Sequence, residues 1–276
     1  MTGLPQINSH HFRPESPTLI DMAAPRPISS YSCLTFDCFG TLVDWESGMY
    51  AALSELTGQL DPFHTLYDNR AGTIELFAKH EGRRVREQPA EIYQRILEDV
   101  YGDVAQELGL EASTEAKKRF GAGIAEWAAF PDTVAALKRL RKHFKLVILS
   151  NVDRTSFSGT LSGPLREVEF DAIYTAQDIG SYKPDPRNFD YLVEHVAEDL
   201  GFSKDGIIHT AYSFPHDLVP AKKLGIVGAW IERGEEVPTV MGGKLEDVPD
   251  HLRPSWQFKS LRDMADAVDF DAANKE

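Results

Sequence analysis

Short apolar segments recur along the chain, and each of them gives way to polar residues. They cover residues 34–36, 145–149, 171–175, 206–211 and 226–231, the last of which is the last strand we expect. Apolar runs of this length, bounded by turn residues, are typical of buried strands. Between them the apolar residues take helical spacing, as at Phe189, Leu192, Val193, Val196 and Leu200. Alternating strands and helices predict an α/β fold with a doubly wound parallel sheet.

One long stretch interrupts this alternation. Between residues 45 and 129 no segment looks like a buried strand, and the apolar residues from Ile92 to Leu108 follow helical spacing. We therefore expect residues 45–129 to be a helical insertion in a core made of residues 31–44 and 130–276. Residues 1–30 contain five prolines among polar residues. They are predicted to be a disordered extension.

Charge and composition argue against several partners. The formal net charge of −14 disfavours nucleic acid and anionic membranes, because both reward positive charge. No run approaches the roughly 18 apolar residues of a membrane span, and the N-terminus lacks the apolar region of a secretory signal. Cys33 and Cys38 would lie about 16 Å apart in an extended strand, too far for a disulfide. Reduced thiols fit a cytoplasmic protein.

Polar side chains follow four of the predicted strands, at one edge of the sheet. Asp37 follows the first strand and Ser150-Asn151 ends the second, while Lys183 and Asp217 lie in the loops after the next two. Ligands bind in the crevice at the carboxyl ends of such strands. Lys183 would hold both carboxylates ionised, and an ionised, partly desolvated carboxylate is a competent nucleophile. Taken singly, each carboxylate could also be a helix cap, and Lys183 a solvated surface residue.

The chain resembles the haloacid dehalogenase-like superfamily in the order and spacing of four motifs. These motifs are Asp37-Cys38-Phe39-Gly40-Thr41, Ser150-Asn151, Ser181-Tyr182-Lys183-Pro184 and the segment from Ser213 to Asp217. The resemblance extends from about Ser32 to the C-terminus. It implies a Rossmann-like core with a helical cap inserted after the first strand, over the active site. Residues 45–129 fit that cap.

Two positions decide which branch of the family the chain resembles. Phosphatases of this superfamily place a second Asp two residues after the nucleophile, where this chain has Phe39. They also commonly carry Gly-Asp before the last Asp to help hold Mg²⁺, where this chain has Ala211-Tyr212. The pattern is instead similar to the L-2-haloacid dehalogenases, which need no metal. Halide is a weak base that leaves carbon without protonation, so a dehalogenase can do without an acid at Phe39.

The resemblance implies a role for each matching residue. Asp37 is the expected nucleophile, oriented by Thr41 and stabilised by Lys183. Asp217 is expected to position or activate the hydrolytic water. The expected substrate-binding residues are Phe39 through its neighbouring backbone N–H groups, Ser150, Asn151 and the cap residue Arg70, which would receive the halide.

Some positions depart from the dehalogenase pattern. Phe189, Phe214 and His216 stand where those enzymes carry Tyr, Asn and an apolar aromatic residue. These changes bear on the halide pocket and the substrate range. His216 could titrate in the site or bond to a neighbouring loop, whereas His209, inside an apolar strand, is interpreted as a satisfied core histidine.

We therefore expect a hydrolase that cleaves the carbon–halogen bond of a small 2-halocarboxylate through an aspartyl ester, without metal or cofactor. A Mg²⁺-dependent phosphatase of a small phosphomonoester and a non-catalytic binding protein are the alternatives. The expected partner is a small anionic organic substrate. A homodimer is compatible with the sequence, which does not decide the oligomeric state.

Overall fold

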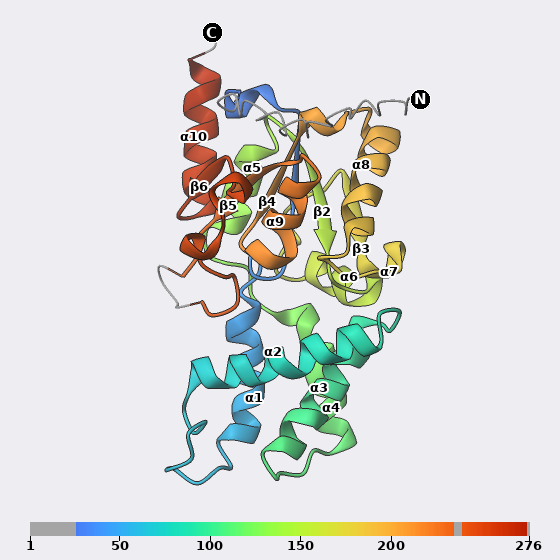
Figure 1. Ribbon diagram of the computed structural model, residues 1–276, viewed down its shortest axis with the longest axis vertical. Helices are drawn as coiled ribbons and strands as arrows, with labels where there is room; N and C mark the ends of the chain where they lie inside the picture. The colour runs from blue at the N-terminus through green and yellow to red at the C-terminus, as the bar shows by residue number, and fades with distance from the viewer. Residues whose placement is uncertain (1–25, 235–238, 275–276) are drawn as a thin grey trace, which may run out of the picture.

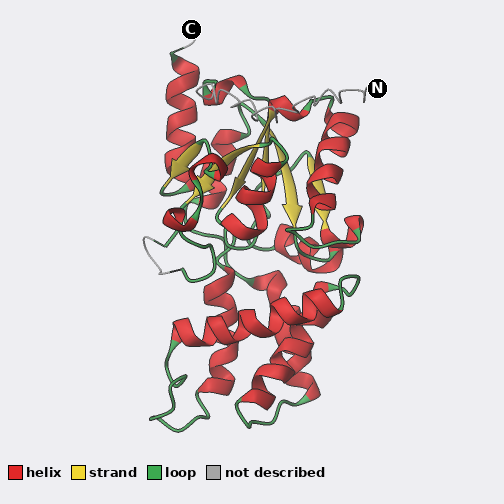
Figure 2. Ribbon diagram, viewed as in Figure 1, coloured by secondary structure: helices red, strands yellow, loops and turns green. Residues whose placement is uncertain are grey.

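The structure, a computed structural model, describes residues 26–234 and 239–274. A sheet flanked by helices forms one part, and a purely helical part lies beyond one end of the strands (Figures 1 and 2). All strand pairs are parallel, in the order β3-β2-β1-β4-β5-β6. The strands are β1 (Cys33–Phe36), β2 (Lys145–Ser150), β3 (Ala172–Thr175), β4 (Ile207–Ala211), β5 (Val227–Ile231) and β6 (Trp256–Phe258).

Helices cover both faces of the sheet, which confirms the doubly wound α/β fold. Alternate residues of β1 point to opposite faces, so that Leu34 and Cys33 belong to two different apolar clusters. The face of Leu34 packs against α5 (Thr133–Leu140) and α10 (Leu261–Ala273). The face of Cys33 packs against α8 (Pro186–Leu200) and α9 (Val219–Lys223). Two further helices, α6 (Arg154–Ser162) and α7 (Ala176–Ile179), follow β2 and β3.

The central strand β1 sets the position of the site. Its four residues are all buried, as a parallel strand covered on both faces requires. Phe36, its last residue, pairs with Ile148 of β2 and Thr210 of β4. The three strands therefore end at nearly the same level, and the loops that follow them converge at one edge.

The helical part, called the cap below, lies beyond that edge (Figure 1). It consists of α1 (Trp45–Thr57), α2 (Arg70–Glu87), α3 (Tyr93–Glu107) and α4 (Thr114–Gly123), followed by the 3₁₀ turn η2 (Ile124–Glu126). Side chains of Asp44, Asn69 and Ser113 cap the first turns of α1, α2 and α4 by accepting backbone N–H hydrogen bonds. Apolar residues of these helices join the same buried cluster as one face of the sheet.

The two chain segments that connect core and cap lie side by side. The backbone N–H of Asp44 donates to the carbonyl of Ala128 (2.8 Å), and that of Phe130 donates to the carbonyl of Leu42 (3.0 Å). An antiparallel bridge between Val43 and Ala129 lies between these two bonds.

Two features differ from the sequence-based expectation. A sixth strand, β6, pairs with β5 beyond the strand we expected to be last. Residues 1–25 of the predicted disordered extension lie outside the described residues, but residues 28–30 form the 3₁₀ turn η1 (Ile28–Ser30). Ile28 is buried and the Ser29 backbone N–H donates to Asp271 (2.9 Å), so disorder is wrong for this segment. Other short turns are η3 (Lys204–Gly206), the π-helical η4 (Phe214–Leu218), η5 (Leu245–Asp247) and η6 (Asp250–Leu252).

In the described part of the chain, no helix is both long and apolar enough to cross a membrane. Cys33 and Cys38 are both buried and free.

Candidate active site

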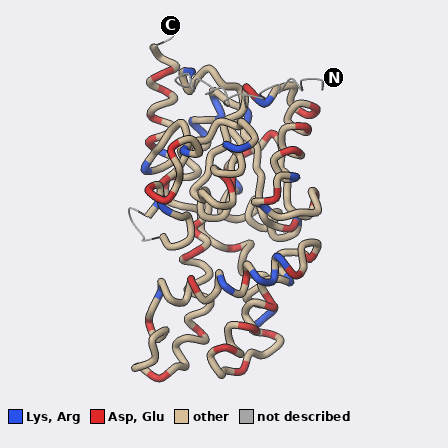
Figure 3. Tube along the Cα trace, viewed as in Figure 1, with Lys and Arg blue, Asp and Glu red and all other residues tan. Residues whose placement is uncertain are grey.

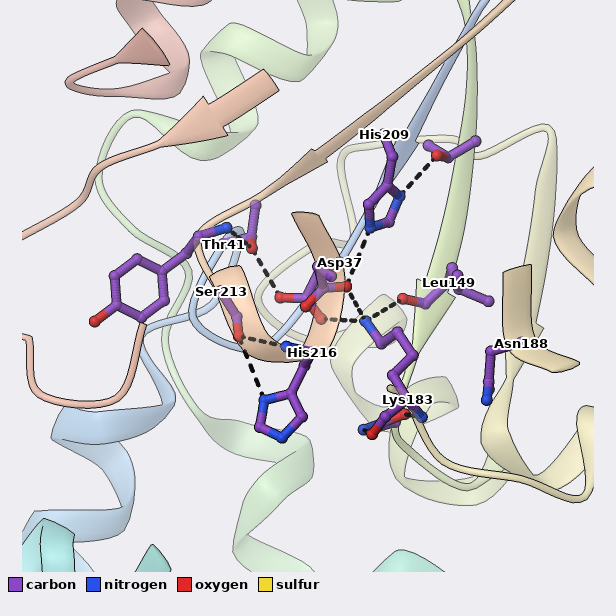
Figure 4. A network of polar contacts seen from close by, with 12 residues as sticks. Asp37, Thr41, Leu149, Lys183, Asn188, His209, Ser213 and His216 are labelled. Carbon is purple, nitrogen blue, oxygen red and sulfur yellow. Dashed lines mark hydrogen bonds and ion pairs between the residues drawn. The ribbon is translucent and has the colours of Figure 1, made fainter. Parts of the chain in front are cut away.

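Asp37 lies directly after β1, at the edge of the sheet that faces the cap (Figure 4). The Thr41 hydroxyl donates to Oδ2 of Asp37 (2.7 Å), and the Lys183 ammonium donates to Oδ1 (2.9 Å). The turn between Asp37 and Thr41 requires glycine at Gly40, whose φ is +99°. A Cβ there would also lie 3.0 Å from the indole nitrogen of Trp45. The turn thus brings the Thr41 hydroxyl back onto the carboxylate that precedes it.

Lys183 connects the two carboxylates. Its Nζ donates to Oδ1 of Asp37, to Oδ1 of Asp217 (2.6 Å) and to the carbonyl of Leu149 (2.9 Å). These three acceptors use the three hydrogens of the ammonium group. Asn151 holds the lysine backbone, accepting from its N–H (2.7 Å) and donating to its carbonyl (3.0 Å). Asn151 therefore has a structural contact that the resemblance did not imply.

The charges of this cluster are not evenly shared. Burial raises the pKa of the Asp37 carboxyl, and the charge of Asp217 adds to that effect against the opposing charge of Lys183. Burial would also raise the pKa of Asp217, but Lys183 and a hydrogen bond from His209 lower it to about 2. The two carboxylates outweigh the effect of burial on Lys183 and raise its pKa. Lys183 lowers the pKa of both carboxyls, as expected, but at Asp37 burial and the charge of Asp217 outweigh it, so that the net shift of the Asp37 pKa is upward.

A cavity of about 110 Å³ separates this cluster from the cap. Core and cap both line it: Asp37, Asp217, Lys183 and His216 belong to the core, and the lining residues of the cap are mostly aromatic. The expected binding residues Phe39, Ser150 and Asn151 are among its lining residues. The aromatic lining residues are, in the core, Phe39 and Tyr212 and, in the cap segment, Trp45, Phe77, Tyr93 and Trp127.

In the described part of the chain, two kinds of hydrogen-bonding group at or next to the residues that line this cavity have no protein partner. The Ser150 hydroxyl is buried without one. Within the described residues, no hydrogen bond uses the backbone N–H of Cys38 or Phe39, which follow Asp37 in the turn. Buried polar groups are normally paired, so these donors are suited to an anionic ligand.

Arg70 does not lie where the resemblance placed it, and the expectation that it lines the pocket is wrong. Its guanidinium donates to the Ser47 hydroxyl (3.2 Å), lies 3.9 Å from the Glu46 carboxylate and stacks over the ring of Tyr50. Arg70 is the first residue of α2, whereas the α2 residues that line the cavity are 77, 78 and 81. At 1.5 Å per residue, Arg70 and residue 81 are about 16 Å apart along the helix axis.

The other cations of α2 do not replace it. Figure 3 shows Lys and Arg gathered along this helix. Arg83 and Arg84 pair with Asp103, and Lys79 with Glu107, both on α3. Among the described residues that line the cavity, Lys183 is the only lysine or arginine.

Two residues at the cavity were missed or left open by the sequence. Glu81 lines the cap side and accepts a hydrogen bond from the Tyr93 hydroxyl (3.2 Å), and burial raises its pKa to about 7. Its spacing from Phe77, one helical turn away, was the available signal. His216 also lines the cavity, with Nδ1 3.3 Å from the Ser213 hydroxyl, and burial lowers its pKa. It therefore belongs to the site as well as contacting a neighbouring residue.

The residues present do not fit a Mg²⁺ site of the kind that related phosphatases use. Mg²⁺ prefers an octahedral set of oxygen ligands. No group of three or more His, Cys, Asp or Glu side chains in the described ranges is placed to hold a metal ion. Oδ1 of Asp37 and Oδ1 of Asp217 both bind the Lys183 ammonium.

Comparisons with known proteins point to one family of hydrolases. Residues 31–203 match the family model of the haloacid dehalogenase-like hydrolases. The (S)-2-haloacid dehalogenase of Pseudomonas fluorescens is 25% identical over 230 residues, covering 82% of this chain and 96% of that protein. The enzyme of the same name from Pseudomonas sp. (strain YL) is 24% identical over 244 residues, covering 88% and 97%.

Solved structures show the same fold. The L-2-haloacid dehalogenase from Xanthobacter autotrophicus superposes with a TM-score of 0.69 at 18% identity, covering 87% of this chain and 98% of that one. The putative HAD-hydrolase YfnB from Bacillus subtilis, bound to magnesium, gives a TM-score of 0.62 at 18% identity, covering 87% and 99%. Since the family model matches more than half of the sequence, this chain belongs to the haloacid dehalogenase-like hydrolases.

Proposed function

We propose that this enzyme hydrolyses the carbon–halogen bond of a small (S)-2-halocarboxylate, without a metal ion or cofactor. The observation that carries the proposal is the environment of Asp37. Its carboxylate is oriented by Thr41 and Lys183 and borders a small, largely aromatic cavity, and Phe39 stands where a phosphatase needs an acid. The names of the similar Pseudomonas enzymes support the same reaction.

In the first step, an oxygen of ionised Asp37 attacks C2 of the substrate. The carbon–halogen bond breaks, its electron pair leaves with the halide, and C2 is inverted as an aspartyl ester forms. The leaving halide takes no proton, so this step needs no general acid. The unpartnered Ser150 hydroxyl and the N–H groups of Cys38 and Phe39 would bind the substrate carboxylate.

In the second step, water attacks the carbonyl carbon of the ester. Asp217 accepts one proton of the attacking water, and the bond between the carbonyl carbon and the ester oxygen breaks. The 2-hydroxy acid leaves with that ester oxygen and with the second proton of the water, so that Asp37 returns as a carboxylate. Oδ1 of Asp217 already accepts from Lys183 and His209, whereas no hydrogen bond described in the structure ends at Oδ2. Oδ2 is therefore the oxygen that would take the proton and pass it to solvent.

A substrate screen tests the reaction class. Halide release from chloro- and bromoacetate and from both enantiomers of 2-chloropropionate is measured beside phosphate release from p-nitrophenyl phosphate, each with EDTA or added Mg²⁺. We expect halide release from the (S)-enantiomer that neither EDTA nor Mg²⁺ changes. Phosphate release that disappears with EDTA and returns with Mg²⁺, without halide release, would favour the phosphatase instead.

A single turnover in oxygen-18 water tests the covalent step. Because water attacks the ester carbonyl, the label should appear in Asp37 and not in the first product. Asp37→Asn should abolish halide release and leave the fold intact, since Asn has nearly the same size but is a very poor nucleophile. Asp190→Asn on the exposed side of α8 is the matched control and should keep full activity. Label in the first product would show direct attack of water on carbon.

The cytoplasmic location and the homodimer remain predictions.

A further inference from the structure

His209 is a buried polar residue that the steps above do not use. It lies in the middle of β4, with no solvent exposure and with Ile208 beside it. An imidazole in such a position costs free energy unless both ring nitrogens find partners. The sequence predicted a satisfied core histidine, and the structure shows which groups satisfy it.

Both ring nitrogens of His209 are paired (Figure 4). Nδ1 lies 2.9 Å from the Thr35 hydroxyl, its direct neighbour in the parallel register of β1 and β4. Nε2 lies 3.1 Å from Oδ1 of Asp217. If the Thr35 hydroxyl donates to Nδ1, the ring proton lies on Nε2 and is donated to the carboxylate. The ring of Phe189 packs edge-to-face against the imidazole, at 5.4 Å between centroids, and limits its rotation.

The partner of Nε2 is the carboxylate that the second step requires. Asp217 lies in the π-helical turn η4, where the Leu218 N–H donates to the Ser213 carbonyl five residues earlier (3.1 Å). Lys183, in the loop before α8, and His209, in β4, approach the same oxygen of Asp217, Oδ1, from different elements of the core. One hydrogen bond leaves a carboxylate free to rotate about its Cβ–Cγ bond, whereas two at Oδ1 determine where Oδ2 points.

We propose that His209 is a positioning residue for the hydrolysis of the covalent intermediate. It touches neither the substrate nor the reacting atoms, and it acts by holding Oδ2 of Asp217 toward the water that attacks the Asp37 ester. Lys183 contacts both carboxylates and serves both steps, whereas His209 is hydrogen-bonded to the Asp217 carboxylate and has no described hydrogen bond to Asp37. This inference rests on the proposed aspartyl-ester mechanism. It adds that the two steps depend on different parts of the cluster.

The test separates the two steps. Formation and decay of the Asp37 adduct with (S)-2-chloropropionate are followed by rapid quench and intact mass, beside steady-state kinetics. In His209→Leu we expect adduct formation within about twofold of the unaltered rate and hydrolysis at least about tenfold slower, about 1.4 kcal/mol. Adduct should accumulate, and kcat should fall while kcat/KM, set by the first step, stays nearly constant.

Two further variants test the hydrogen bonds of His209, and a third is a control. His209→Gln can place an amide N–H near the position of Nε2, so it should recover part of the hydrolysis rate. Thr35→Val removes the hydroxyl that pairs with Nδ1 at nearly constant volume, so it should slow hydrolysis selectively even if His209→Leu does not fold. His195→Leu replaces a histidine of α8 that bonds to the Tyr191 carbonyl and stacks on its ring, remote from the cluster, and should change neither step.

The outcomes distinguish this inference from the mechanism on which it rests. If the unaltered protein forms no adduct with any haloacid, the proposed function fails and this inference fails with it. If it forms the adduct but the folded His209 and Thr35 variants hydrolyse it at the unaltered rate, only the role of His209 is overturned. Equal slowing of both steps would show a merely structural histidine.

Discussion

Replacing Glu81 by Gln tests the electrostatics of the cap side of the cavity through protein stability. Burial disfavours the charged form of this carboxyl and raises its pKa from 4.5 to about 7, against the hydrogen bond from Tyr93 and the charge of Arg86. A difference of about 2.5 pKa units, at about 1.4 kcal/mol each, corresponds to about 3 kcal/mol in the free energy of unfolding.

The sign follows from which state releases its proton first. Below pH 4.5 the carboxyl is protonated in both the folded and the unfolded chain, and Glu81 contributes nothing to the pH dependence. Between pH 4.5 and about 7 the unfolded chain releases the proton while the folded one keeps it, so stability falls as pH rises. Above about pH 7 the loss is complete. Gln stays neutral and can still accept the Tyr93 hydrogen bond.

Urea unfolding followed by tryptophan fluorescence measures this difference. We expect Glu81→Gln and the unaltered protein to be equally stable near pH 4.5, and the variant to be more stable by up to about 3 kcal/mol near pH 8. Glu75→Gln, an exposed position on the same helix, is the control and should show no such trend. The reasoning is refuted if the stability difference between Glu81→Gln and the unaltered protein does not change with pH, or if Glu75→Gln shows the same change.

Other expectations concern activity. Ser150→Ala should raise KM for a haloacid about tenfold with little change in kcat, since it removes one donor to the substrate carboxylate, and an unchanged KM would remove Ser150 from the binding site. Arg70→Ala should change kcat/KM by less than about twofold because its guanidinium contacts Ser47 and Glu46 outside the cavity, whereas a larger loss would mean that Arg70 moves to the substrate. Asp217→Asn should let the covalent adduct accumulate, and mass spectrometry of the quenched reaction detects it. Ionised Glu81 would repel a haloacid anion, so KM should rise above about pH 7 in the unaltered protein but not in Glu81→Gln.

The core part of the site was predictable from the sequence because a parallel sheet brings its strand ends together. Once Asp37, Lys183 and Asp217 were assigned to loops at the carboxyl ends of strands of one parallel sheet, their proximity followed from the fold. The strands themselves could be predicted because a strand that is buried on both faces of the sheet consists of a continuous run of apolar residues. The short strand β6 offered too few residues for such a pattern, and its assignment depends on pairing with β5.

The cap was predictable as helices but not as a wall of the cavity. Periodicity identifies which residues of α2 share a face, yet which face meets the core depends on how the helices pack. Arg70 was assigned to the cavity from sequence similarity, whereas the packing places Glu81 there and leaves Arg70 beside Glu46. The sequence predicted that Lys183 acts on both carboxylates, but not that the pKa of Asp37 and the pKa of Asp217 shift in opposite directions. The effect of Lys183 on Asp37 and Asp217 depends on distances that no motif states.

The paired segments that connect core and cap have an evolutionary consequence. Because Asp44 and Ala128 are hydrogen-bonded neighbours, the chain leaves and re-enters the sheet at nearly the same point. An insert of another length or shape can therefore close there at little entropic cost, provided that its own ends lie close together. The residues that select a substrate and those that break its bond can then diversify independently. A lineage can exchange the insert and change what reaches Asp37, while Lys183 and Asp217 stay in place.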